Sequence, residues 1–84
     1  MLKIKDNIDL KELEKFWFKK NEFYPNYVYE TISKKGNQVF INVDKETRII
    51  NGCVAGICLV PLNDNQIGYF CEAIFEAGFV EKVK

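Results

Sequence analysis

The stretch that most constrains the fold is 62–79, because its sequence is typical of one amphipathic helix with both ends marked. Asn63 and Gln66 match a capping box, and Gly78 suits the left-handed residue that follows a helix. We therefore predict a helix over residues 64–77 that packs against another element. Its apolar face follows the i, i+3, i+4, i+7 and i+8 spacing of a helix, at Ile67, Phe70, Cys71, Ile74 and Phe75.

A second capped helix is predicted near the N-terminus, with Asp9 as its N-cap and with its end at Lys20 and Asn21. Residues 1–7 alternate between apolar and polar side chains, which indicates a short strand or, alternatively, a frayed terminus. The apolar stripe of this helix consists of Leu10, Leu13, Phe16 and Trp17.

Between the two helices the sequence predicts a β-meander. Side chains alternate between two faces along segments 27–33 and 38–43, which are joined by a hairpin turn at Gly36. A polar turn over 44–47 then leads to a third strand over 48–51. The Asn51-Gly52 pair indicates a further turn. The apolar run 53–60 is interpreted as a fourth strand, with a loop packed on the sheet as the alternative. The predicted fold is α+β, in the order α-β-β-β(-β)-α, an antiparallel meander with two helices packed on one face, and residues 1–84 form a single domain.

Composition excludes several classes of partner. Lysine and arginine together number 12, as do aspartate and glutamate, so the formal net charge is zero and the broad positive field of a nucleic-acid binder is missing. The run 53–60 is far shorter than the roughly 20 apolar residues of a transmembrane helix, and the N-terminus is too charged for a secretory signal. We therefore predict no membrane association, and nucleic acid is disfavoured as a partner.

The inventory of reactive side chains argues against an enzyme. The sequence contains no histidine, which removes the commonest general base and the usual imidazole ligand. Cys53, Cys58 and Cys71 form no close pair that would bind zinc and no disulfide framework, so free thiols in a reducing cytoplasm are expected. We predict no catalytic residue, no metal and no cofactor.

Aromatic side chains concentrate between Phe16 and Tyr29. Exposed aromatic residues often dominate protein interfaces because they bury a large area and lose few rotamers. One alternative is that Phe16, Trp17 and Phe23 belong to the core and that the tyrosines form cross-strand pairs. We predict a partner-binding surface formed by Trp17, Tyr24, Tyr27 and Tyr29 and rimmed by Lys19 and Lys20.

The two ends of the chain, IDLKELEKFWFKKNEFY and CEAIFEAGFVEKVK, resemble those of small proteins often encoded by phages and mobile elements of AT-rich Gram-positive bacteria. In those proteins a helix of the form LxxLxxFGF precedes a β-meander, and the last helix ends in an AGLVEKV-like tail. Trp17 stands where such sequences often carry glycine, and Phe79 where leucine is common. The resemblance implies a cytoplasmic, non-enzymatic accessory protein.

The leading hypothesis is a protein–protein interaction module that binds or inhibits a host protein such as a defence complex. The alternative is a dimeric DNA- or RNA-binding regulator, although the predicted helix 64–77 has no basic residue for phosphate or base contacts. A homodimer is a separate possibility, because the apolar run 53–60 at a sheet edge would need a second copy to cover it.

Overall fold

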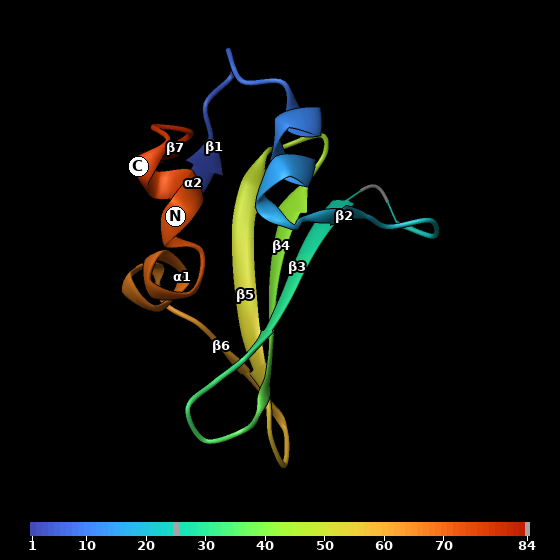
Figure 1. Cartoon of the computed structure of the whole chain (residues 1–84), viewed down its shortest axis with the longest axis vertical. Coiled ribbons are helices and arrows are strands. Elements are labelled where there is room, and N and C mark those ends of the chain that lie inside the picture. The colour runs from blue at the N-terminus through green and yellow to red at the C-terminus, as the bar shows by residue number, and fades with distance from the viewer. Residues whose placement is uncertain (25, 84) are drawn as a thin grey trace.

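A seven-stranded antiparallel sheet forms one layer of the fold, and three short helices form the other (Figure 1). The computed structural model describes residues 1–24 and 26–83. In chain order the elements are β1 (Leu2–Ile4), the 3-10 helix η1 (Leu10–Phe16), β2 (Lys19–Lys20), β3 (Asn26–Ile32), β4 (Gln38–Asp44), β5 (Ile49–Ala55), β6 (Leu59–Pro61), α1 (Asp64–Phe70), α2 (Glu72–Glu76) and β7 (Val80–Lys82). The α+β class predicted from the sequence is confirmed.

The strands follow the order β2-β3-β4-β5-β1-β7, and β6 pairs with the second half of β5. The predicted meander corresponds to β3, β4 and β5, and its first turn carries Gly36 at φ +85°, as expected. The sequence missed β2 beside β3 and β7 near the C-terminal end. β1 lies within residues 1–7, where a short strand was predicted, and β6 overlaps the run 53–60, which was interpreted as a fourth strand. The prediction therefore contained too few strands.

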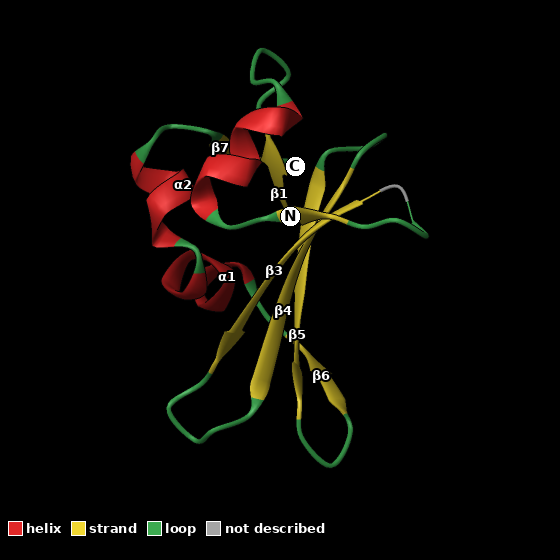
Figure 2. Cartoon of the chain, turned by 45° about the vertical axis from the view of Figure 1, so that its right-hand side comes forward, coloured by secondary structure: helices red, strands yellow, loops and turns green. Residues whose placement is uncertain are grey.

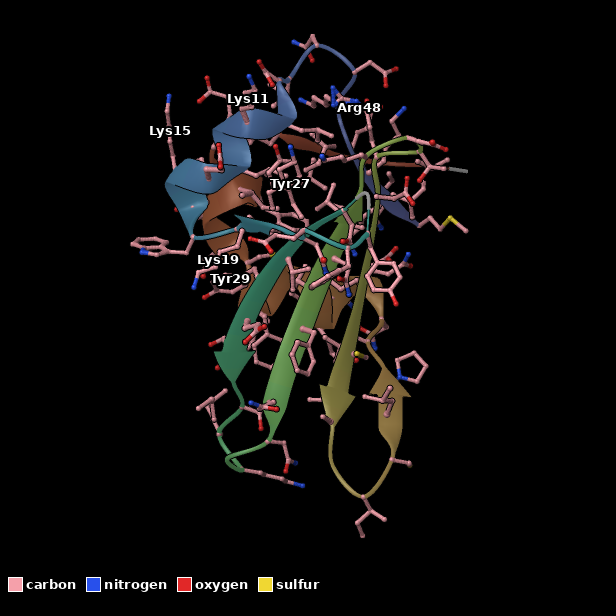
Figure 3. The ribbon with its side chains drawn as sticks, turned by 90° about the vertical axis from the view of Figure 1, so that its right-hand side faces the viewer. Lys11, Lys15, Lys19, Tyr27, Tyr29 and Arg48 are labelled. Atoms are coloured by element: carbon pink, nitrogen blue, oxygen red, sulfur yellow. The ribbon has the colours of Figure 1, made fainter. Side chains whose placement is uncertain are left out.

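The helical layer covers one face of the sheet, as predicted (Figure 2). In β4 the apolar side chains Val39, Ile41 and Val43 are buried, whereas the residues between them are not. Leu13 of η1, Ile67 of α1 and Ile74 of α2 belong to the same buried cluster. Figure 3 looks onto the other face, where the lower halves of β3 to β6 have no helix in front of them.

The first predicted helix is shorter and tighter than expected. Asp9 is its N-cap, as predicted, and its carboxylate accepts from the Lys11 N–H at 3.0 Å. The segment is a 3-10 helix that ends at Phe16, because Trp17 adopts the left-handed conformation at φ 67° and turns the chain. Lys20, predicted to end the helix, lies in β2 instead.

The last helix is correctly capped but divided. Asn63 and Gln66 form the reciprocal capping box, and Gly78 at φ +77° is followed by the Phe79 N–H donating to the Ile74 carbonyl, which is the predicted Schellman end. The prediction of one continuous helix over 64–77 is wrong, because Cys71 leaves helical geometry at ψ 47° and separates α1 from α2. No helix in 1–24 or 26–83 has the length and apolar character needed to cross a membrane.

Gly52 does not mark a turn, contrary to the prediction. It lies inside β5 opposite Ile41, and a Cβ atom there would lie 2.8 Å from the Ile41 Cδ1 and 2.9 Å from the Leu62 Cδ1. The glycine therefore serves close packing between the sheet and the segment before α1. The turn occurs after Ala55 instead, so the run 53–60 is neither one strand nor a packed loop but parts of β5 and β6 with the tip of a hairpin between them.

We expect Gly52→Ala to lower the free energy of unfolding by about 1–3 kcal/mol, because overpacking forces neighbouring side chains out of their positions. Gly56→Ala is the matched control, since an added Cβ there meets no atom closer than 4.0 Å. Urea denaturation followed by circular dichroism measures both variants. Equal stability of the two would show that the close approach at Gly52 does not constrain the fold.

Candidate functional site

The segment between η1 and β3 exposes large aromatic side chains. Trp17 ends η1 with its backbone N–H donating to the Leu13 carbonyl, and Phe18 donates to the same carbonyl at 3.2 Å. This left-handed turn sends Phe18 into the core, where it is 2% exposed, and leaves Trp17 75% exposed. The backbone thus separates two adjacent aromatic residues into a core residue and a surface residue.

The loop after β2 is held by Asn21. Its side-chain oxygen accepts from the Phe23 N–H at 2.8 Å and from the Tyr24 N–H at 3.3 Å, and its backbone N–H donates to the Asn26 carbonyl. Phe23 is 87% exposed and Tyr24 68% exposed. We call Trp17, Phe23 and Tyr24 the aromatic edge. Its backbone is ordered by hydrogen bonds although its side chains make little contact with the body of the protein.

The structure divides the predicted partner-binding residues. Trp17, Tyr24, Lys19 and Lys20 are exposed, as that prediction requires. Tyr27 is 4% exposed and belongs to the core, so its side chain has no surface to offer a partner, and we correct its assignment. Tyr29 also faces the covered side and packs on the Phe18 ring at 5.4 Å between centroids, so only its unburied part reaches solvent.

The two lysines of β2 point to opposite faces of the sheet. Lys19 pairs with Val28, whose side chain is on the open face, and Lys20 pairs with Tyr27 on the covered face. Near Lys20, the Lys45 ammonium lies 5.7 Å from the centre of the Tyr27 ring. Desolvation and then the charge of Lys20 lower the pKa of Lys45. Lys19 alone therefore borders the open face beside the aromatic edge.

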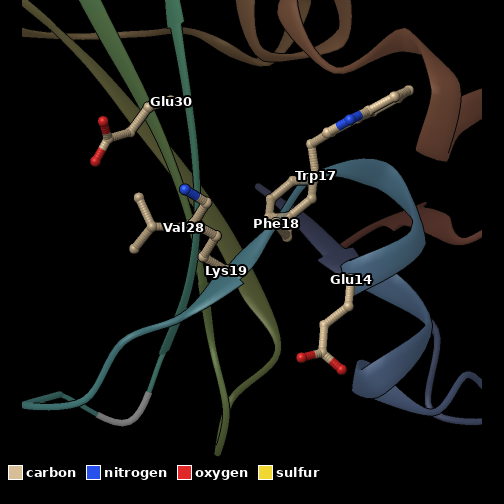
Figure 4. Close-up of a pocket in the computed structure, with 6 residues that line it drawn as sticks. All are labelled: Glu14, Trp17, Phe18, Lys19, Val28 and Glu30. Carbon is tan, nitrogen blue, oxygen red and sulfur yellow. The ribbon is translucent and has the colours of Figure 1, made fainter.

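A surface pocket of about 540 Å³ lies beside Trp17, between the end of η1 and β3. Figure 4 shows Trp17, Phe18 and Glu14 on one side of it and Val28 and Glu30 on the other. Lys19 completes the lining. Among the ion pairs of the described residues none involves Glu14, Glu30 or Lys19, whereas the nearby Glu12 pairs with Lys15 at 2.6 Å.

Glu14 was not singled out from the sequence, and Phe23 was, in one alternative, placed in the core. The alternation of side chains along β3 was evident in the sequence, but alternation alone does not show which of the two faces of the strand packs against the helices. Asn21 carried the one usable signal, because asparagine side chains often accept from backbone N–H groups two residues later and so order a surface loop.

The described part of the chain shows no cluster of metal ligands, and one of its three thiols is buried. It holds no cluster of three histidine, cysteine, aspartate or glutamate side chains that is arranged for a metal ion. Cys71 is buried, its thiol donates to the Ile67 carbonyl at 2.9 Å, and burial raises its pKa from 9.0 to about 12. Cys71 therefore stays a neutral thiol near pH 7.

We expect a thiol reagent at pH 8 to modify Cys58, which is exposed in the β5–β6 turn, and to leave Cys71 unmodified until the protein unfolds. Because unfolded molecules are on the order of 10⁻³ or less of the population, Cys71 should react at least about 1,000-fold more slowly. Raising the pH to 9 does not remove the protection, since its folded-state pKa is about 12. Tandem mass spectrometry of the tryptic peptide 49–82, which contains both Cys58 and Cys71, locates the label and measures each rate; comparable rates for the two thiols would contradict the burial of Cys71.

Comparisons with models of protein families, with curated proteins and with solved structures found no significant match to this chain. The resemblance of its ends to phage and mobile-element proteins therefore stays a prediction. Position 17 has the left-handed backbone that favours glycine.

Proposed function

We propose that the protein is a small, non-enzymatic module that binds another protein through the aromatic edge, with Lys19 at its rim. The observation that carries the proposal is the conformation and exposure of Trp17. A residue other than glycine loses about 1–2 kcal/mol in the left-handed conformation. The exposed indole at Trp17 recovers little of that cost through packing, since it is 75% exposed.

A strained residue with no packing role is typical of a functional position. Phe23 and Tyr24, in the loop at the other end of β2, are also largely exposed, and aromatic residues dominate binding hot spots. The backbone beneath them is fixed by Asn21, so little loop entropy is lost when a partner binds.

The biological role that we propose rests on the resemblance of the two ends of the chain. It is that of a cytoplasmic accessory protein of a phage or mobile element, which binds or inhibits a host protein such as a defence complex. Such a role requires a stable surface and no chemistry of its own. The aromatic edge supplies such a surface.

The test is affinity capture from a bacterial extract, quantified by mass spectrometry, with the wild type and the double variant Trp17→Ala, Tyr24→Ala. Ile57→Ala is the matched control, because Ile57 is an exposed apolar residue at the tip of the β5–β6 hairpin. A protein retained by the wild type and by Ile57→Ala, and lost by the double variant, supports the proposal. If Ile57→Ala loses the protein and the double variant keeps it, binding occurs at the hairpin and the proposal fails.

Self-association is a second interaction that we propose, on the ground that β6 lies at an open edge with exposed Leu59 and Val60. Pro61 at the end of β6 removes one backbone donor and so limits the length of any pairing. Sedimentation velocity at micromolar concentration tests the dimer. A strictly monomeric species at all concentrations counts against it.

A further inference from the structure

The outer edge of β3 is paired along only part of its length. β2 pairs with Tyr27 and Val28, and β3 continues to Ile32 without a neighbour on that side in the described chain. The Ser33 N–H donates to the Asn37 carbonyl, and the backbone groups of an antiparallel strand point alternately to its two neighbours. The backbone N–H and C=O groups of Thr31 therefore point towards β4, and those of Glu30 and Ile32 point away from it. The backbone N–H and C=O groups of Glu30 and Ile32 are therefore free to pair with another strand.

The pocket beside Trp17 occupies the position that a longer β2 would fill. Continuing the register in which Lys19 pairs with Val28 would place Trp17 opposite Glu30. The left-handed turn at Trp17 instead directs the chain into η1. The vacated position becomes the 540 Å³ pocket, with Glu30 along one wall (Figure 4).

The other open edges carry features that discourage strand pairing. β6 ends in Pro61, which lacks an N–H, and β7 exposes the charged side chains of Glu81 and Lys82. The free part of β3 ends in Ile32, which is 66% exposed. The outer edge of β2 is open as well, but both of its residues are exposed lysines. Of these four open segments of the described sheet, β3 is the one best able to accept an added strand.

The charges around the pocket favour a basic segment. Glu14 and Glu30 supply two carboxylates, and Lys19 supplies one ammonium group. Trp17 adds an exposed indole, the aromatic ring that attracts cations most strongly. Arginine can pack its stem on an aromatic ring and direct its guanidinium to a carboxylate, so it fits these walls better than an apolar or acidic side chain.

We propose that the β3 edge accepts an extended, basic segment of a partner protein as an additional β-strand. Its backbone hydrogen-bonds with Glu30 and Ile32, and an arginine opposite Glu30 lies in the pocket between Trp17 and the two carboxylates. The inference rests on the proposed function, because it describes how a protein partner would meet the aromatic edge. Backbone pairing supplies affinity in such complexes, and side-chain pockets supply specificity.

The test uses the fluorescence of Trp17, which is the single tryptophan of the chain. A short alternating valine–threonine peptide with one central arginine is titrated into the full-length protein. Two matched peptides are titrated alongside it. One has glutamate in place of the arginine. The other carries a methyl group on the backbone nitrogen of the arginine, which blocks the central backbone hydrogen bond. We expect saturable binding of the arginine peptide and at least about tenfold weaker binding of both matched peptides.

Variants locate the bound peptide. The double variant Glu14→Gln, Glu30→Gln should bind the arginine peptide about tenfold more weakly than the wild type does. The control is Glu46→Gln, which removes an exposed carboxylate in the β4–β5 turn and should leave binding unchanged. Circular dichroism checks that each variant is folded. Equal binding of the N-methylated peptide, preference for the glutamate peptide, or no binding up to about 1 mM would each overturn strand addition.

A single-stranded oligouridine is titrated as a further probe. Quenching of Trp17 that is stronger than with any peptide and that weakens steeply with salt would overturn the proposal in favour of nucleic acid. The capture experiment distinguishes a failure of strand addition from a failure of the proposed protein-binding function. If the double variant Trp17→Ala, Tyr24→Ala loses a captured protein while no peptide binds, strand addition is wrong and the protein-binding function stands.

Discussion

Replacing Trp17 with glycine is expected to abolish partner binding while leaving the domain as stable as the wild type or slightly more stable. Glycine adopts the left-handed conformation without the steric cost of about 1–2 kcal/mol that an L-residue carries. Its greater entropy in the unfolded state offsets about 0.5–1 kcal/mol of that gain. The indole, which is 75% exposed, contributes little packing that could be lost.

The expected loss of binding is large because a central tryptophan typically contributes 2 kcal/mol or more, which is about 30-fold in the dissociation constant. Stability is measured by urea denaturation followed by circular dichroism, and binding by the capture experiment. The combination of lost binding with unchanged or higher stability is the signature of a residue retained for function at the expense of the fold.

Arg48→Gly provides the contrast. Arg48 has nearly the same backbone conformation, at φ 66°, but its guanidinium donates to the Ile8 carbonyl at 2.9 Å and 2.6 Å. Removing those hydrogen bonds should cost about 1.5–3 kcal/mol, which exceeds the net gain from relieving the backbone once the unfolded-state entropy of glycine is subtracted. If Trp17→Gly instead destabilises the protein as much as Arg48→Gly does, the indole has a structural role and our account of position 17 is wrong.

The parts of the fold that the sequence predicted are those specified by neighbours in the chain. The capping box of Asn63 and Gln66, the N-cap Asp9 and the left-handed Gly36 and Gly78 each depend on contacts within a few residues. The parts that it missed depend on partners far along the chain. Strands of two or three residues, such as β2 and β7, have no periodicity of their own and exist because another strand accepts them.

The candidate site shows the same division. An aromatic cluster at 16–29 was evident from composition, but the exposure of each ring was not. Tyr27 and Tyr29 share a face with Val43 and Ile41, and only the position of the helices makes that face the covered one. The exposure of Trp17 follows from a single left-handed residue, whose conformation is unexpected for tryptophan and so could not be predicted.

Ile4→Ala is expected to lower the free energy of unfolding by about 2–5 kcal/mol, which is a large fraction of the stability of a domain of this size. Ile4 is completely buried in β1, within residues 1–7, where a strand was predicted and a frayed terminus was the alternative. Its backbone N–H donates to the Arg48 carbonyl at 2.9 Å, and it pairs with Val80 of β7. The backbone of Ile4 thus joins the β4–β5 turn to the last strand, and its side chain anchors β1 in the buried cluster.

The control is Lys5→Ala, whose side chain lies outside the buried cluster and whose replacement should change stability by no more than about 0.5 kcal/mol. Urea denaturation gives both values, and hydrogen exchange reports where the structure opens. The amides of Lys5 and Val83, which donate to the carbonyls of Phe79 and Met1, should lose protection together in Ile4→Ala, because among the described residues β7 pairs with β1 alone. A loss below about 1 kcal/mol, with β7 still protected, would mean that β1 is dispensable and that the meander and helices form the core without it.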